Sequence, residues 1–214
     1  MGNKLVEAKF NCLINPYGVM YNPLSVAKAL REVIEQKQYH SSDLFEYNEK
    51  WHSWMHHGSF SSTHQEQVLE KINSQLEVAQ CELPTLDYLL VTWGSAWVYK
   101  RVDTEEVVSN CHKVDGNEFS RVRIGVGEIV KEYVNLFKDL WEVSPRLKVI
   151  MSLSPIRHIR DGMHANQLSK ATLLLAIDEL QKLFPTQVVY FPSYEIVLDE
   201  LRDYRFYAED MVHP

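Results

Sequence analysis

Residues 88–97 read YLLVTWGSAW, an apolar run followed at once by a turn of small and polar residues. The run is too short for a helix and is rich in Val, Leu and aromatic side chains, which is typical of a buried strand. Three more stretches share this composition, and each predicts a strand: NCLI at 11–14, KVIMSL at 148–153 and QVVYF at 187–191.

Between these strands, apolar residues recur at helical spacing. Four such stripes predict amphipathic helices, at 26–34, 68–79, 126–141 and 173–184. Lys170, just ahead of the last stripe, is expected to solvate its helix. Strands that alternate with helices favour an α/β fold with a parallel sheet covered on both faces. No linker or repeat interrupts the pattern, so we predict a single domain over residues 1–214.

The first element breaks the pattern. Residues 2–10 predict a short helix that leads into the strand at 11–14. Doubly wound folds normally place a strand before their first helix, so the opening strand of the sheet is expected to be missing from this chain. A missing strand would leave an unpaired edge, which also predicts pairing between chains as a homo-oligomer.

Polar, turn-rich segments follow every predicted strand. They are NPYG at 15–18, GSAW at 94–97, SPIRHIRDG at 154–162 and PSYE at 192–195. Because the carboxyl ends of parallel strands meet at one edge of the sheet, a functional site is expected there.

Composition limits the classes of partner. The formal net charge is -7, which argues against a nucleic-acid partner, and no basic run resembles a membrane-binding patch. The start, MGNKLVEAKF, lacks the apolar core of a signal peptide, and the three cysteines fit a reducing compartment. The sequence therefore predicts a cytoplasmic protein that acts on a small molecule.

The last five residues, DMVHP, place Asp210 three residues before His213. A carboxylate at this spacing can reach the Nδ1–H of the imidazole across a turn and leave Nε2 as a general base. This pair is half of the machinery of a nucleophilic hydrolase.

Several stretches together resemble the GSCFA family, which belongs with the SGNH/GDSL hydrolase superfamily. They are NPYGVMYNPLSVAKAL, TWGSAWVY, SNCHK, SPIRHIRDG with NQLSKATLL, and YFPSYEIVLDELRDYRFYAEDMVHP. The resemblance implies a three-layer α/β/α fold with a parallel, flavodoxin-like sheet. It also implies roles: His213 as base, Asp210 as its orienting carboxylate, and Asn110 and Gly94 as donors to the oxyanion.

The nucleophile of the family is the Ser of a Gly-Ser-Cys-Phe-Ala motif, which this sequence does not contain. We expect the motif upstream, on the missing first strand, and we expect the chain to be shortened at its carboxyl end as well. Ser59 and Ser95 lie outside any nucleophile-elbow pattern, and we disfavour both as nucleophiles. Cys111 lies beside His112, but sequence neighbours rarely face each other for proton transfer, so we disfavour this thiol as well.

Two segments supply candidate substrate contacts. Arg157 and His158 follow the third predicted strand, and a guanidinium suits an anionic or polar substrate. His56 and His57 lie in WHSWMHHGSF, a tryptophan- and histidine-rich segment similar to one in the family. As a minority alternative, His52 and His56 would share one face of a helix and could bind zinc.

Three functions therefore stand in competition. The leading one is an SGNH-type serine esterase or acyltransferase that acts on an ester, with an acylated carbohydrate as a candidate substrate, and needs no cofactor. The second is a non-catalytic module that binds glycan or acyl groups on the same scaffold, because such a protein would lack a nucleophile. The third is a metal-dependent enzyme built on the histidine-rich segment.

Overall fold

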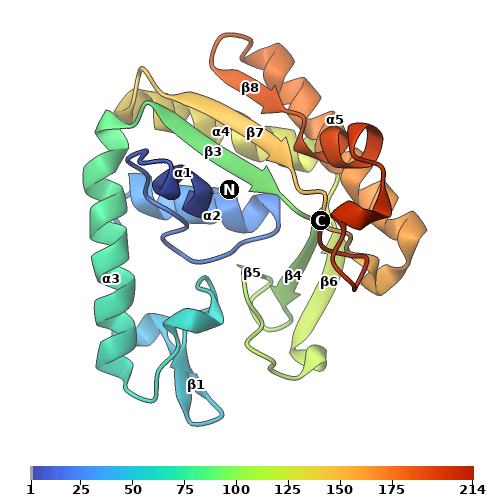
Figure 1. Ribbon diagram of the computed structural model, residues 1–214. Coiled ribbons are helices and arrows are strands. Elements are labelled where there is room, and N and C mark those ends of the chain that lie inside the picture. The colour runs from blue at the N-terminus through green and yellow to red at the C-terminus, as the bar shows by residue number, and fades with distance from the viewer. Residues whose placement is uncertain (1) are drawn as a thin grey trace.

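A computed structural model describes residues 2–214, with the side chain of Asp161 excepted. Its main sheet contains β3 (Tyr88–Trp93), β7 (Lys148–Leu153) and β8 (Val188–Phe191). The three strands are parallel in the order β3-β7-β8, and Leu90, Ile150 and Val189 lie in register across them (Figure 1). Three of the four predicted strands and the parallel sheet are confirmed.

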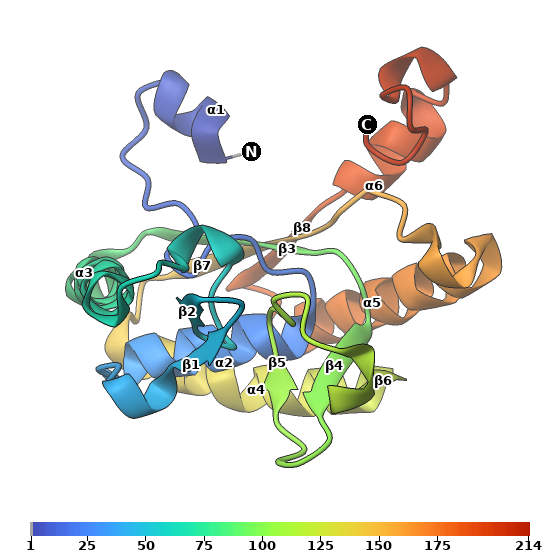
Figure 2. The ribbon, with the colours of Figure 1, turned by 90° about the horizontal axis from the view of Figure 1, so that it is seen from below.

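Three long helices cover one face of this sheet: α2 (Pro23–Ile34), α4 (Val126–Val143) and α5 (Met163–Leu183) (Figure 2). Trp93 of β3 is fully buried, and its indole N–H donates to the hydroxyl of Tyr133 on α4. That hydroxyl donates in turn to the backbone carbonyl of Pro23, the first residue of α2. The sheet and two of its helices are therefore joined by one buried chain of hydrogen bonds.

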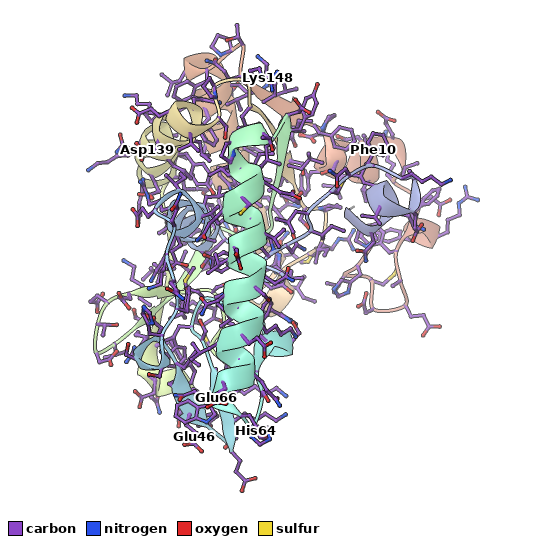
Figure 3. All side chains as sticks on the ribbon, turned by 90° about the vertical axis from the view of Figure 1, so that its left-hand side faces the viewer. Phe10, Glu46, His64, Glu66, Asp139 and Lys148 are labelled. Atoms are coloured by element: carbon purple, nitrogen blue, oxygen red, sulfur yellow. The ribbon has the colours of Figure 1, made fainter. Side chains whose placement is uncertain are left out.

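The edge of the molecule next to β3 is formed by α3 (Gln65–Glu82). The helix runs from the end of the molecule marked by Glu46 to the start of β7, marked by Lys148 (Figure 3). Its buried residues are Val68, Ile72, Leu76 and Ala79, which lie at helical spacing. All four predicted helical stripes thus form helices.

The opposite face of the sheet carries α1 (Gly2–Glu7) and, near the carboxyl terminus, α6 (Ser193–Glu195) with the π-helical turn Ile196–Glu200 (Figure 2). Helices on both sides of a parallel sheet give the three-layer α/β/α fold that the sequence predicts. This outer layer is sparse, since Tyr88 is 60% exposed and Val189 51% exposed. Within residues 2–214 no helix is both long and apolar enough to cross a membrane.

The prediction of a strand at residues 11–14 is wrong. These residues have no regular secondary structure, and none of their backbone groups joins a strand ladder. An apolar run becomes a strand only where a neighbouring strand supplies hydrogen-bond partners. The segment instead crosses from α1 toward α2, and Phe10, just before it, is 62% exposed and lies away from the helical layer (Figure 3).

Two small antiparallel sheets lie below the main sheet in Figure 1. One, near the amino end of α3, is the hairpin of β1 (Phe45–Tyr47) and β2 (Lys50–His52). The other lies beyond the carboxyl end of β3 and has the order β5-β4-β6, with β4 at Trp97–Arg101, β5 at Val107–Val108 and β6 at Phe119–Arg123. Neither sheet was predicted.

A buried lysine joins the loops that follow two neighbouring strands, β3 and β7. Lys170 on α5 is 1% exposed, and its ammonium group donates to the backbone carbonyls of Gly94 at 2.7 Å and Ser154 at 2.6 Å. Gly94 follows β3 and Ser154 follows β7, so one side chain fixes both loops. The expectation that Lys170 only solvates its helix is therefore wrong. Burial lowers the pKa of Lys170 to about 7.

This burial predicts an unusual pH dependence of stability. Between about pH 7 and pH 10 the unfolded chain keeps a protonated Lys170 that the folded chain loses, so unfolding becomes less favourable as pH rises. As pH rises, the free energy of unfolding of the wild-type protein should increase relative to that of Lys170→Met, by at most about 1.4 kcal/mol per pH unit. Urea denaturation across this range measures it.

Lys131→Met, at an exposed position of α4, is the matched control and should show no such divergence. Parallel stability curves for the wild-type protein and Lys170→Met would contradict a Lys170 that releases its proton in this range.

Candidate active site

The carboxy-terminal Asp–His pair forms as the sequence predicts. Nδ1 of His213 lies 2.6 Å from Oδ2 of Asp210, and because a carboxylate only accepts, the imidazole N–H is the donor. The other carboxylate oxygen, Oδ1, accepts the backbone N–H groups of Val212 and His213. Hydrogen bonds from the backbone N–H of Val212, and then from the ring and the backbone N–H of His213, lower the pKa of Asp210 to about 2. Nε2 of His213 is left as the basic nitrogen.

Arg157 holds the segment that carries this pair. Its backbone N–H donates to the carbonyl of Val212 at 3.1 Å, and its Nη1 donates to the carbonyl of Met211 at 2.9 Å. Its guanidinium also lies 4.1 Å from the ring centroid of Tyr207, a cation–π contact. The sequence predicts Arg157 as a substrate contact, which stays a prediction; in this structure its side chain also holds the final segment.

His158 lies against Gly94. A Cβ atom on Gly94 would lie 3.1 Å from Nε2 of His158, so a side chain here would require the imidazole to shift. The Nε2 atom is buried and has no hydrogen-bond partner among the described residues. Burial, and then the positive charges of Lys170, Arg121 and His213, lower the pKa of His158 to about 4. A neutral imidazole therefore stands between the loop of Gly94 and the final segment.

The N–H group of Gly94 is already in use. It donates to the backbone carbonyl of Tyr21 at 2.8 Å, and the N–H of Ser95 donates to the same oxygen at 3.0 Å. The sequence assigned Gly94 as an oxyanion donor, and in this structure the carbonyl of Tyr21 occupies that donor. An oxyanion could take this position only after the Tyr21 carbonyl moved away.

Asn110 lies on the wall of a cavity. Its side-chain oxygen accepts the backbone N–H of His112 at 2.9 Å, and its own backbone N–H donates to the carbonyl of Trp54 at 3.2 Å. These two bonds fix the residue and leave the side-chain NH2 as a donor. Asn110 lines a cavity of about 410 Å³ together with His57.

The adjacent histidines His56 and His57 have different environments. The His56 ring is fully buried and stacks on Tyr17, with a centroid separation of 4.5 Å. Burial, with a smaller effect of His112, lowers the pKa of His56 to about 3. Because the ring is fully buried in the core, a substrate cannot reach it. His57 is half-buried and borders the cavity. Gly18, at φ 82°, leaves room for it, because a Cβ there would lie 2.3 Å from Cβ of His57.

The structure does not support a zinc site at His52 and His56. His52 is in strand β2 and His56 follows in a turn, so the two do not share a helix face. Across residues 2–214, apart from the Asp161 side chain, no group of three or more His, Cys, Asp or Glu side chains is arranged to hold a metal ion.

The three alternative nucleophiles are poorly placed. Ser95 is buried, and its hydroxyl oxygen accepts the backbone N–H of Trp97. Burial raises the pKa of Cys111 to about 11, which keeps it a thiol. Ser59 is exposed and contacts Nδ1 of His57 within its own turn.

Sequence reasoning missed Lys170 and Tyr21. A signal for Lys170 exists, because it lies three residues before Leu173 and seven before Ile177 and so belongs to the buried stripe of α5. No sequence signal places the Tyr21 carbonyl against Gly94, since a backbone carbonyl is common to all residues.

The structure thus brings together Gly94, His158, Arg157 and the Asp210–His213 pair, places Asn110 and His57 on a neighbouring cavity, and buries His56. No curated protein and no solved structure matches the chain. The GSCFA family model matches residues 1–214, the whole chain. This protein therefore belongs to the GSCFA family.

Proposed function

We propose that this chain carries the base and the oxyanion donors of an SGNH-type serine esterase or acyltransferase, and that its substrate is an ester such as an acylated carbohydrate. The observation that carries the proposal is the His213–Asp210 pair, whose segment Arg157 holds, next in sequence to the His158 that lies against Gly94. The carboxylate fixes the tautomer of His213, so Nε2 can take a proton from a serine hydroxyl.

The nucleophile in this proposal is the family serine, outside residues 1–214. Among the described residues, no serine or cysteine side chain hydrogen-bonds Nε2 of His213. The free edge of β3, which pairs only with β7, is where an additional strand could add to the sheet. A serine carried at the end of such a strand would lie at the same edge of the sheet as Gly94.

The proposed reaction needs no cofactor. The serine oxygen attacks the ester carbonyl carbon while its proton passes to Nε2 of His213. The oxyanion that forms accepts hydrogen bonds from the side-chain NH2 of Asn110 and from the N–H of Gly94, once the Tyr21 carbonyl has moved. His213 then protonates the leaving alcohol, and water or an acceptor hydroxyl releases the acyl group by the same route.

A second function is favoured by one observation. The Tyr21 carbonyl occupies the N–H groups of both Gly94 and Ser95, which closes one oxyanion donor. A non-catalytic module that binds a glycan or acyl group would tolerate this closed arrangement. The two proposals differ in turnover, which the following experiment measures.

Extending the chain with the residues encoded directly upstream should yield hydrolysis of a short-chain p-nitrophenyl ester. In the extended protein, His213→Ala should lower kcat by orders of magnitude, because the serine loses its base. Asn110→Ala should lower kcat by about 10²–10³-fold if it donates to the oxyanion. His164→Ala, an exposed histidine at the start of α5, is the matched control and should leave the rate unchanged.

A folded extended protein without activity on acetyl, butyryl or acylated-sugar esters would favour the binding module. Full activity in the 214-residue chain would overturn the upstream serine and return attention to Ser59, Ser95 and Cys111.

The positioning role of Arg157 predicts a second outcome. Arg157→Ala removes the bond to Met211 and the contact with Tyr207, so backbone amides in residues 204–214 should exchange with deuterium faster. In the extended protein kcat should fall while KM changes little. Arg146→Ala, at an exposed position before β7, is the control. A rise in KM with unchanged exchange would instead make Arg157 a substrate contact.

A further inference from the structure

The cavity beside Asn110 is lined by basic and neutral groups. It has a volume of about 410 Å³ and lies between the β1–β2 hairpin, the turn at 57–61 and the loop at 110–113. Lys50, Lys113, His52, His57 and His112 all line it, and none of its lining residues is Asp or Glu. In a chain with a formal net charge of -7, this local excess of basic groups runs against the overall composition.

The groups at the wall of the cavity are donors. Nδ1 of His57 accepts the backbone N–H of Ser59, so in the neutral ring the proton sits on Nε2, which can donate. The side-chain NH2 of Asn110 is free to donate because its oxygen is held by His112. The ammonium groups of Lys50 and Lys113 are exposed, and within the described residues neither has an ion-pair partner.

His52 and His112 contact each other at the cavity wall. Nε2 of His52 lies 3.1 Å from the carbonyl of Tyr47, and Nε2 of His112 lies 2.8 Å from the carbonyl of Ser53. Nδ1 of His52 contacts the hydroxyl of Ser61 at 2.7 Å and Nδ1 of His112 at 3.1 Å. Burial is the main cause that lowers the pKa of His112 to about 4, so its ring adds no positive charge near neutral pH.

The backbone of the same loop is held in a costly conformation. His112 has φ 48° and Lys113 has φ 61°, both in the left-handed region that side chains other than glycine rarely adopt. Consecutive residues of this kind persist where the surrounding structure imposes them, which is frequent at binding sites. Here the conformation brings His112 and Lys113 to one cavity wall.

We infer that this cavity binds an oxyanion, a phosphate or carboxylate group, and that it holds an anionic substituent of the ester substrate next to Asn110. The second half of the inference rests on the proposed function, whereas binding of the anion does not. Two ammonium groups and the N–H donors of His57 and Asn110, with no carboxylate in the lining, match the charge and the acceptor oxygens of such a group.

The direct test is an NMR titration of the 214-residue chain with inorganic phosphate and, separately, with acetate. Ring C–H signals of His57 and His112 should shift saturably with at least one of the two anions, and which one binds identifies the oxyanion. Lys50→Gln/Lys113→Gln should weaken that binding about tenfold or more, through loss of two charged donors. Lys131→Gln/Lys138→Gln makes the same charge change on exposed positions of α4 and should bind as the wild-type protein does.

Absence of saturable shifts with both anions, or equal weakening by both double variants, would overturn the inference. Thermal unfolding of each variant confirms that it is folded.

A kinetic arm separates this inference from the proposed function. In the chain extended upstream, Lys50→Gln/Lys113→Gln should raise KM about tenfold or more for a p-nitrophenyl ester with a carboxylate on its acyl group, but not for the neutral butyryl ester. Equal effects on both esters would overturn the substrate assignment. Phosphate or acetate binding without hydrolysis of any ester would refute the proposed function and leave the anion site standing. Hydrolysis without anion binding would do the reverse.

Discussion

The buried ammonium group of Lys170 is the constraint on which the site depends. Its burial carries a large desolvation cost, which is offset by hydrogen bonds to the carbonyls of Gly94 and Ser154 and by a longer contact with the ring of Tyr194. Those carbonyls end β3 and β7, so the loops that carry Gly94, Arg157 and His158 are fixed relative to each other. The final segment can then dock on Arg157, which sets the position of His213.

Two polar groups of the site differ in whether they have a hydrogen-bond partner. Gly94 lies in a rigid loop, and its N–H must have a partner when no substrate is bound, which the Tyr21 carbonyl supplies. Among residues 2–214, Nε2 of His213 has no such partner, and it lies on an exposed segment. The cavity beside Asn110 adds a third element, a donor-rich wall, which in our proposal orients a charged group of the substrate.

Apolar periodicity and residue spacing predicted the elements that depend on residues close in sequence. The strands at 88–93, 148–153 and 187–191 and the helices between them follow from apolar periodicity, and the Asp210–His213 bond follows from spacing alone. The strand at 11–14 failed because a strand requires a partner that composition does not reveal. The core position of His56, between Tyr17 and Tyr39, and the bond from Arg157 to Met211 arise from tertiary contacts between distant segments, which periodicity cannot predict.

We propose that His213 activates a serine at the edge of the sheet where Gly94 lies. Labelling the upstream-extended protein with a fluorophosphonate, followed by peptide mass spectrometry, tests this role, because the reagent reacts with serines made nucleophilic by a neighbouring base. We predict one adduct, on the serine of a Gly-Ser-Cys-Phe-Ala motif, and its loss in His213→Ala. An adduct that persists in His213→Ala, or one on Ser59 or Ser95, would show that His213 is not the base for such a serine.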